Sequence, residues 1–90
     1  MNINTVHMLS KPYSYYSTIQ LDKLIASNDA LLLIGDACYD HASYMGLSDK
    51  CYMLESCATA RAISVDTGIN LISDIEWVAL VDNAKKSITW

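Results

Sequence analysis

The feature that most constrains the fold is an unbroken apolar run, ALLLI, at residues 30–34. Successive side chains of a strand point to opposite sides of a sheet, so a strand that is apolar at every position must be buried on both sides. Such strands are typical of the centre of a parallel sheet that helices cover on both faces.

Four further apolar runs suit strands: Ile3 to Leu9, KCYML at 50–54, INLI at 69–72 and SITW at 87–90. Helical patterns alternate with these runs. Their spacing is short for strand–helix–strand units, but it is feasible with two-turn helices. The sequence therefore predicts one domain over residues 1–90. We expect a small three-layer α/β/α domain with a mostly parallel sheet of about five strands.

Capping patterns indicate where the helices begin. Ser17 with Gln20, and Ser73 with Glu76, have the spacing of capping boxes, in which two side chains bond amides at a helix start. Ser56 is placed to cap a third helix.

The spacing of apolar residues predicts which side of each helix faces the sheet. The expected inner residues are Leu21, Leu24 and Ile25 in the first helix, and Ile75, Val78 and Val81 in the C-terminal helix. A loop and a short helix that ends near Gly46 are expected over residues 36–45.

The charge balance argues against direct nucleic-acid binding. The net charge is −4, and the six Lys and Arg residues are scattered, with only Lys85 and Lys86 adjacent. Binding to a phosphate backbone rests on clustered basic residues. The chain is also 52% hydrophobic and only 18% charged, which suggests a surface reserved for another subunit.

We expect a cytoplasmic protein. No apolar run approaches the length needed to span a membrane, and the N-terminus lacks the pattern of a secretory signal. Three cysteines form an odd number without a framework spacing, which favours a reducing compartment and no structural disulfide.

Cys38 is the most suggestive thiol, because it follows the second strand, at an edge where open α/β sheets place their sites. His41 is the nearest base. Asp36 and Asp40 flank the thiol, and their charges would raise its pKa. Two interpretations stay open: a functional Cys38 helped by His41, or a semi-buried packing thiol.

The other thiols favour packing roles. Cys51 lies within the third strand, and Cys57 is expected in the first turn of a helix among small residues. A tetrahedral metal site needs four ligands, and no second close pair joins Cys38 and His41. Gly-rich phosphate loops are also missing, so we expect neither a metal nor a cofactor.

Large aromatic residues are the candidates for an interface. Tryptophan and tyrosine often anchor contacts between subunits, although core packing is the alternative for each. We select two tryptophans and a tyrosine-rich loop: Trp77, Trp90, Tyr13, Tyr15 and Tyr16. His7, on the first strand, is interpreted as a hydrogen-bonded structural residue.

Four short motifs lie in order along the chain: VHMLSKPY at residues 6–13, ALLLIGDACY at 30–39, CYMLESCATARAI at 51–63 and INLISDIEWVALVDNAKKSITW at 69–90. In this order they resemble the TusB/DsrH family of sulfur-relay subunits. VHMLSKPY matches the family's opening at His7, Leu9, Lys11 and Pro12, without its serine before the proline; ALLLIGDACY matches at Asp36 and Tyr39, with Ala37 in place of a glycine. CYMLESCATARAI matches at Tyr52, Leu54, Glu55, Ala60, Arg61 and Ile63; the last 22 residues match at Leu71, Ile72, Trp77, Val78, Leu80 and Trp90.

The resemblance implies a parallel-type sheet with helices on both faces. It also implies a heterohexamer with TusC-like and TusD-like subunits, or DsrF-like and DsrE-like ones, that relays persulfide sulfur. In the Tus branch the product is 2-thiouridine at the wobble position of certain tRNAs, and the working cysteine belongs chiefly to the TusD or DsrE subunit. The first helical stretch, TIQLDKLIA, lacks the cysteine of some DsrH members, which favours the Tus-like branch.

We therefore expect a non-catalytic subunit of a sulfur-relay complex, without a catalytic cysteine of its own. Cys38, Cys51 and Cys57 match no cysteine position of the family. Three alternatives remain: a DsrH-like subunit in sulfur oxidation, a sulfurtransferase that uses Cys38 itself, and a chain that forms a homo-oligomer when alone.

Overall fold

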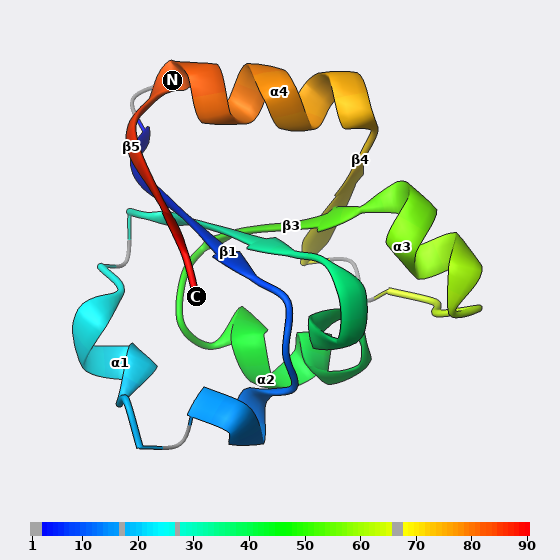
Figure 1. The fold of residues 1–90 in the computed structure, drawn as a ribbon, viewed down its shortest axis with the longest axis horizontal. Helices are drawn as coiled ribbons and strands as arrows, with labels where there is room; N and C mark the ends of the chain where they lie inside the picture. The colour runs from blue at the N-terminus through cyan, green and yellow to red at the C-terminus, as the bar shows by residue number, and fades with distance from the viewer. Residues whose placement is uncertain (1–2, 17, 27, 66–67) are drawn as a thin grey trace.

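The computed structural model describes residues 3–16, 18–26, 28–65 and 68–90. Its five strands form one all-parallel sheet in the order β4-β3-β2-β1-β5 (Figure 1). The strands are β1 (Ile3–Leu9), β2 (Ala30–Leu33), β3 (Lys50–Leu54), β4 (Ile69–Ile72) and β5 (Ala84–Thr89). The predicted α/β fold is confirmed, and β5 begins three residues before the expected SITW segment.

Helices cover both faces of the sheet. The segments that follow β1, β2 and β3 pack on one face, and α4 lies across the opposite face (Figure 1). The short elements are η1 (Tyr13–Tyr16), α1 (Leu21–Leu24), η2 (Gly35–Asp40), α2 (His41–Met45) and α3 (Glu55–Ala60), and α4 spans Asp74–Asn83. Of the helices in the described ranges, none is long and apolar enough to cross a membrane.

The central strand behaves as its sequence predicts. β2 is the middle strand of the five, and all four of its residues are fully buried. Leu31 and Leu33 belong to the larger core cluster, beneath the short helices. Ala30 and Leu32 belong to the smaller cluster, beneath α4. An apolar run without polar alternation therefore contributes side chains to the core clusters on both faces of the sheet.

The inner side of α4 differs from the prediction. The Ser73–Glu76 capping box is confirmed. However, Ile75 is 83% exposed and Val78 is 65% exposed, while Trp77 and Leu80 pack against the sheet. α4 is apolar on more than one side, so the pattern alone did not fix its rotation. The bulky Trp77 ring takes the inner position instead.

Two other capping predictions are wrong. Gln20 has a left-handed backbone (φ 58°) immediately before α1, so it cannot be the third residue of a helix. Ser17, its predicted partner, lies outside the described residues. Ser56 lies inside α3, whose N-cap position is occupied by Leu54. Leu21 on α1 and Ile25, which directly follows this helix, are buried as expected, whereas Leu24 is 49% exposed.

Candidate functional site at the carboxyl edge of the sheet

The segments that follow β1, β2 and β3 meet at one edge of the sheet, because parallel strands end on the same side. Cys38 and the tyrosine-rich η1 segment both lie there. Gly35, with φ +54°, turns the chain from β2 into η2 and so carries Cys38 back over the core. The sheet thus brings together residues that sequence analysis had selected separately.

The Cys38 side chain is a core thiol. It is fully buried, and its Sγ donates a weak hydrogen bond to the Leu33 carbonyl oxygen at 3.7 Å. Its pKa is raised from 9.0 to about 11, chiefly by burial and to a smaller extent by Cys57 and Asp36, while the Arg61 charge partly offsets these effects. At neutral pH the thiol is therefore protonated, and a protonated thiol is a poor sulfur acceptor.

His41 lies beside Cys38 but binds its backbone. The Nδ1 atom of His41 is 2.9 Å from the Cys38 carbonyl oxygen. A carbonyl oxygen can only accept, so Nδ1 carries the hydrogen in this contact. This contact fixes the turn between η2 and α2, and it is not the contact that a base activating the thiol would make.

The remaining cysteines do not assemble a metal site. Cys51 is 1% exposed in β3, near the Tyr44 carbonyl oxygen at 3.8 Å, and burial raises its pKa to about 11. Cys57 is partly exposed in the first turn of α3. Among the described residues, no group of three or more His, Cys, Asp or Glu is arranged to hold a metal ion.

The two buried thiols are expected to make the protein less stable as the pH rises from about 9 to about 11. The folded chain keeps two protons in this interval that the unfolded chain releases, because burial raises both pKa values from 9.0 to about 11. The free energy of unfolding should therefore fall by about 1.4 kcal/mol per pH unit for each thiol. Urea unfolding across this interval measures the slope. A Cys38→Ala variant with the wild-type slope would contradict the assignment.

Most of the predicted interface aromatics make contacts within the chain. Trp77 packs on the core beneath α4, and Tyr13 lies edge-on to Tyr44 with ring centroids 5.2 Å apart. Tyr16 is 2% exposed in the isolated chain, and its hydroxyl donates to the Trp90 carbonyl oxygen at 3.4 Å. Tyr15, which is 64% exposed, is the member of the set best placed for a partner.

Two exposed tyrosines at this edge each lie beneath a cation. Lys11 Nζ is 5.7 Å from the centre of the Tyr15 ring, and the Arg61 guanidinium is 5.9 Å from that of Tyr39. Both distances suit cation–π contacts. We call these four residues the carboxyl-edge surface. Sequence analysis had not selected Tyr39 as a contact residue, although Lys11, Tyr39 and Arg61 are matched positions of the TusB/DsrH resemblance.

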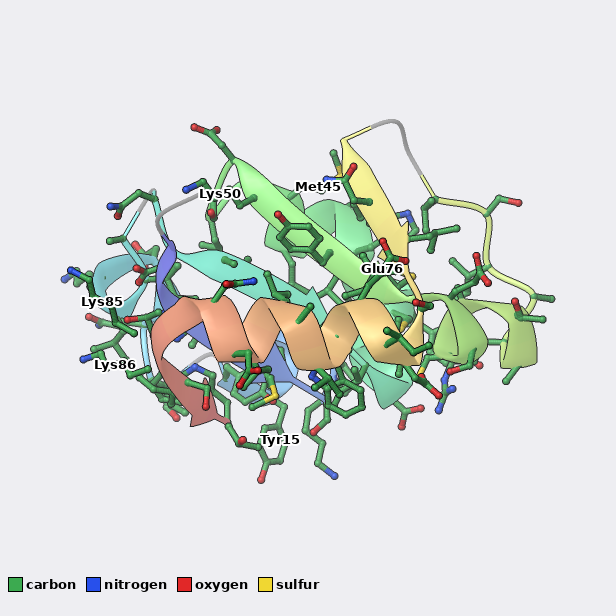
Figure 2. The ribbon with its side chains drawn as sticks, turned by 90° about the horizontal axis from the view of Figure 1, so that it is seen from above. Tyr15, Met45, Lys50, Glu76, Lys85 and Lys86 are labelled. Atoms are coloured by element: carbon green, nitrogen blue, oxygen red, sulfur yellow. The ribbon has the colours of Figure 1, made fainter. Side chains whose placement is uncertain are left out.

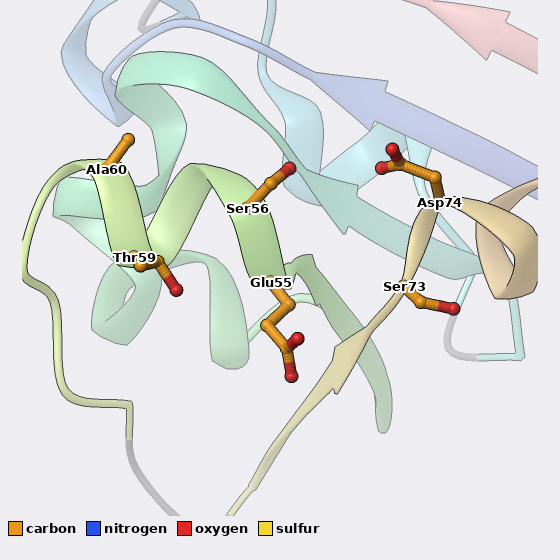
Figure 3. Close-up of a pocket in the computed structure, with 6 residues that line it drawn as sticks. All are labelled: Glu55, Ser56, Thr59, Ala60, Ser73 and Asp74. Atoms are coloured by element: carbon orange, nitrogen blue, oxygen red, sulfur yellow. The ribbon is translucent and has the colours of Figure 1, made fainter.

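A pocket of about 490 Å³ opens between α3 and the start of α4 (Figure 3). The helices after β3 and β4 lie on opposite faces of the sheet, and such a change of side leaves a crevice at the strand ends. Its lining is hydroxyl-rich and acidic: Glu55, Ser56, Thr59, Ala60, Ser73 and Asp74. The carboxylates disfavour anions there, and sequence analysis missed the pocket because its two walls are distant in the chain.

His7 lies at the centre of a buried polar network. Its Nε2 is 2.9 Å from Asp29 Oδ2, and the Trp90 indole donates to its Nδ1 at 3.0 Å. Since Nδ1 accepts, Nε2 carries the hydrogen and donates to Asp29. Both ring nitrogens are therefore occupied, which confirms the prediction that His7 is structural. The first and last motifs of the family resemblance, at His7 and Trp90, meet in this contact.

The comparisons with known proteins add no family assignment. No family model matches the chain, and no curated protein matches its sequence.

Proposed function

We propose that this chain is a non-catalytic subunit of a cytoplasmic sulfur-relay complex that supports 2-thiolation of the tRNA wobble uridine. It would join TusC-like and TusD-like subunits in a heterohexamer. The observation that carries the proposal is at the carboxyl edge, where Lys11 and Tyr39 are exposed and Arg61 is partly exposed at motif positions, while Cys38 beside them is buried. The motif residues there offer contacts rather than a reactive thiol.

The carboxyl-edge surface has the chemistry to face a persulfide on another subunit. A persulfide is acidic and is anionic at neutral pH, and nearby cations stabilise sulfur anions. Lys11 and Arg61 provide such charges, although Asp36 pairs with Arg61 at 3.5 Å. Tyr15 and Tyr39, 64% and 59% exposed, offer contact area of the kind that anchors interfaces.

The burial of Cys38 weakens the alternative in which this chain carries the sulfur itself. Transfer to Cys38 would need its thiolate, and burial raises the pKa of this thiol to about 11. It would also require η2 to open, because the side chain is 0% exposed. A carrier cysteine is expected to be both accessible and readily ionised.

Co-expression with the sister subunits tests the proposal. We expect a stable complex, and a Tyr15→Ala, Tyr39→Ala variant should bind at least about tenfold more weakly, as hot-spot tyrosines do. Leu24→Ala, which removes an exposed apolar side chain from α1, is the matched control. A chain that never co-purifies with these subunits, or a double variant that binds normally, would contradict the proposal.

A further inference from the structure

The contact between His7 and Trp90 holds the residue that follows β5 against the core. The indole Nε1 donates to His7 Nδ1 at 3.0 Å, and the two ring planes are inclined by only 16°. The Trp90 amide also donates to the Met8 carbonyl oxygen at 3.0 Å. His7 is 2% exposed, whereas Trp90 is only partly buried. The indole therefore has a direct route to solvent that the imidazole lacks.

The hydrogen bonds of this contact require a neutral His7. An indole nitrogen is a donor only, so Nδ1 of His7 must offer its lone pair. The other ring nitrogen, Nε2, donates to Asp29 Oδ2 at 2.9 Å. A proton added to Nδ1 would place two N–H groups against each other across the 3.0 Å between His7 and Trp90. Protonation of His7 and its hydrogen bond with Trp90 therefore exclude each other.

Among the described residues, Asp29 is the charged group that contacts the imidazole. Its 2.9 Å contact with Nε2 becomes an ion pair once His7 is protonated. Leu31 of β2 and Ile88 of β5 lie beside His7 in the sheet and carry no charge. The charged side chains of α1 and of the first β3 residue are exposed or partly exposed to solvent: Asp22, Lys23 and Lys50.

The other titratable side chains in the core cluster on this face are phenols and buried thiols, which stay uncharged between about pH 5 and 8. They are Tyr16, Tyr44, Cys38 and Cys51. Asp29 is thus the partner that would hold a protonated imidazole in place.

We propose that the contact between His7 and Trp90 is proton-sensitive and regulates the carboxyl-edge surface. Protonation of His7 keeps the pairing with Asp29 and releases the Trp90 indole. Histidine is the side chain whose charge ordinarily changes between about pH 5 and 8, so a fall in pH within this interval is the signal.

Release of Trp90 acts on the carboxyl-edge surface through Tyr16. The Tyr16 hydroxyl donates to the Trp90 carbonyl oxygen at 3.4 Å, and its ring lies edge-on to Tyr15 with centroids 5.2 Å apart. Figure 2 shows Tyr15 at the margin of the molecule, where a partner can reach it. Loss of the Trp90 contact weakens the support behind this tyrosine pair. The effect on a partner rests on the proposed function, whereas the release of Trp90 is a property of the chain alone.

Nuclear magnetic resonance of the full chain, titrated from about pH 8 to about pH 5, tests the release. The sequence has two tryptophans, so the indole signal that Trp90→Phe removes belongs to Trp90. We expect this signal to move to the position of a free indole with the same midpoint as the His7 ring signals, while the β2 amide signals stay in place. An indole signal that does not follow His7, or a His7 that takes up no proton, would overturn the proposal.

The reverse effect is a second test, because two linked events influence each other equally. Trp90→Phe removes a hydrogen bond that only neutral His7 accepts, so it should raise the midpoint of His7 protonation by at least about 0.5 pH unit. Trp77→Phe, the same substitution in the cluster beneath α4, should leave this midpoint unchanged. His41, the other histidine, should keep its midpoint in both variants. Equal His7 midpoints in the wild type and Trp90→Phe would overturn the coupling.

Binding to the sister subunits across the same pH interval tests the regulation. Acidification should weaken binding of the wild type, and Trp90→Phe, which has no indole to release, should lose this part of the pH dependence. A complex that is equally stable before and after release of Trp90 would overturn the regulation. A chain that releases Trp90 but never joins the sister subunits rejects the proposed function, and the proton-sensitive contact still stands.

Discussion

Replacing Asp29 with alanine is expected to lower the free energy of unfolding by about 3 kcal/mol. The Asp29 carboxylate is buried, and its Oδ2 accepts from the Ala26 amide at 3.1 Å as well as from His7 Nε2 at 2.9 Å. The alanine variant leaves the buried imidazole N–H without an acceptor. It also frees the amide that closes the turn before β2. Urea unfolding at neutral pH measures the loss.

An asparagine variant separates the hydrogen bonds from the charge. Asp29→Asn keeps one acceptor oxygen for His7, so it should cost about half as much as Asp29→Ala. Asp29 Oδ1 has no hydrogen-bond partner among the described residues, so the amide nitrogen placed there would gain none. An Asp29→Ala variant within 0.5 kcal/mol of the wild type, about the scale of a neutral surface change, would show that the network contributes little.

Replacing Leu33 with alanine should destabilise the fold still more, by about 4 kcal/mol. Leu33 is fully buried on the central strand, within the larger core cluster. Neighbouring strands hold it on both sides, so the site cannot collapse to fill the space that the side chain leaves. A domain of this size has on the order of 10 kcal/mol of stability or less, so the variant approaches the limit of folding. Thermal and urea unfolding report the change.

Leu24→Ala is the matched control for this core substitution. Leu24 is 49% exposed on α1, so the same truncation there should cost less than about 1 kcal/mol. If the two variants lost similar stability, β2 would not be the centre of the core.

The sheet could be predicted because its signal is local. ALLLI lacks alternation, and only a strand buried on both faces tolerates that composition. The Ser73–Glu76 capping box is likewise complete within four residues, and it forms. In each case neighbouring residues alone determine the local structure, so the prediction did not require knowledge of distant contacts.

The rotation of α4 could not be predicted in the same way. Apolar residues occur around the helix, so Ile75, Val78 and Val81 fit the helical period as well as Trp77 and Leu80 do. Contact with the sheet decides between these sets, and it favours Trp77 and Leu80. Packing of Trp77 against the sheet leaves Ile75 and Val78 in solvent.

The candidate site was predicted in position but not in accessibility. The place of Cys38 after the second strand located it at the carboxyl edge. Its complete burial depends on η2 folding back over the core, which no local pattern encodes. The contact of Trp90 with His7 joins residues 83 positions apart, so it too required the fold.

Intact mass of the protein, co-purified with its sister subunits and treated with a persulfide donor, tests the central claim most directly. One added sulfur atom increases a chain's mass by about 32 Da. The account predicts this adduct on a sister subunit and none on Cys38 or Cys51, because both of these thiols are buried with raised pKa values. An adduct on this chain that disappears in Cys38→Ser would contradict the account and make Cys38 a sulfur carrier.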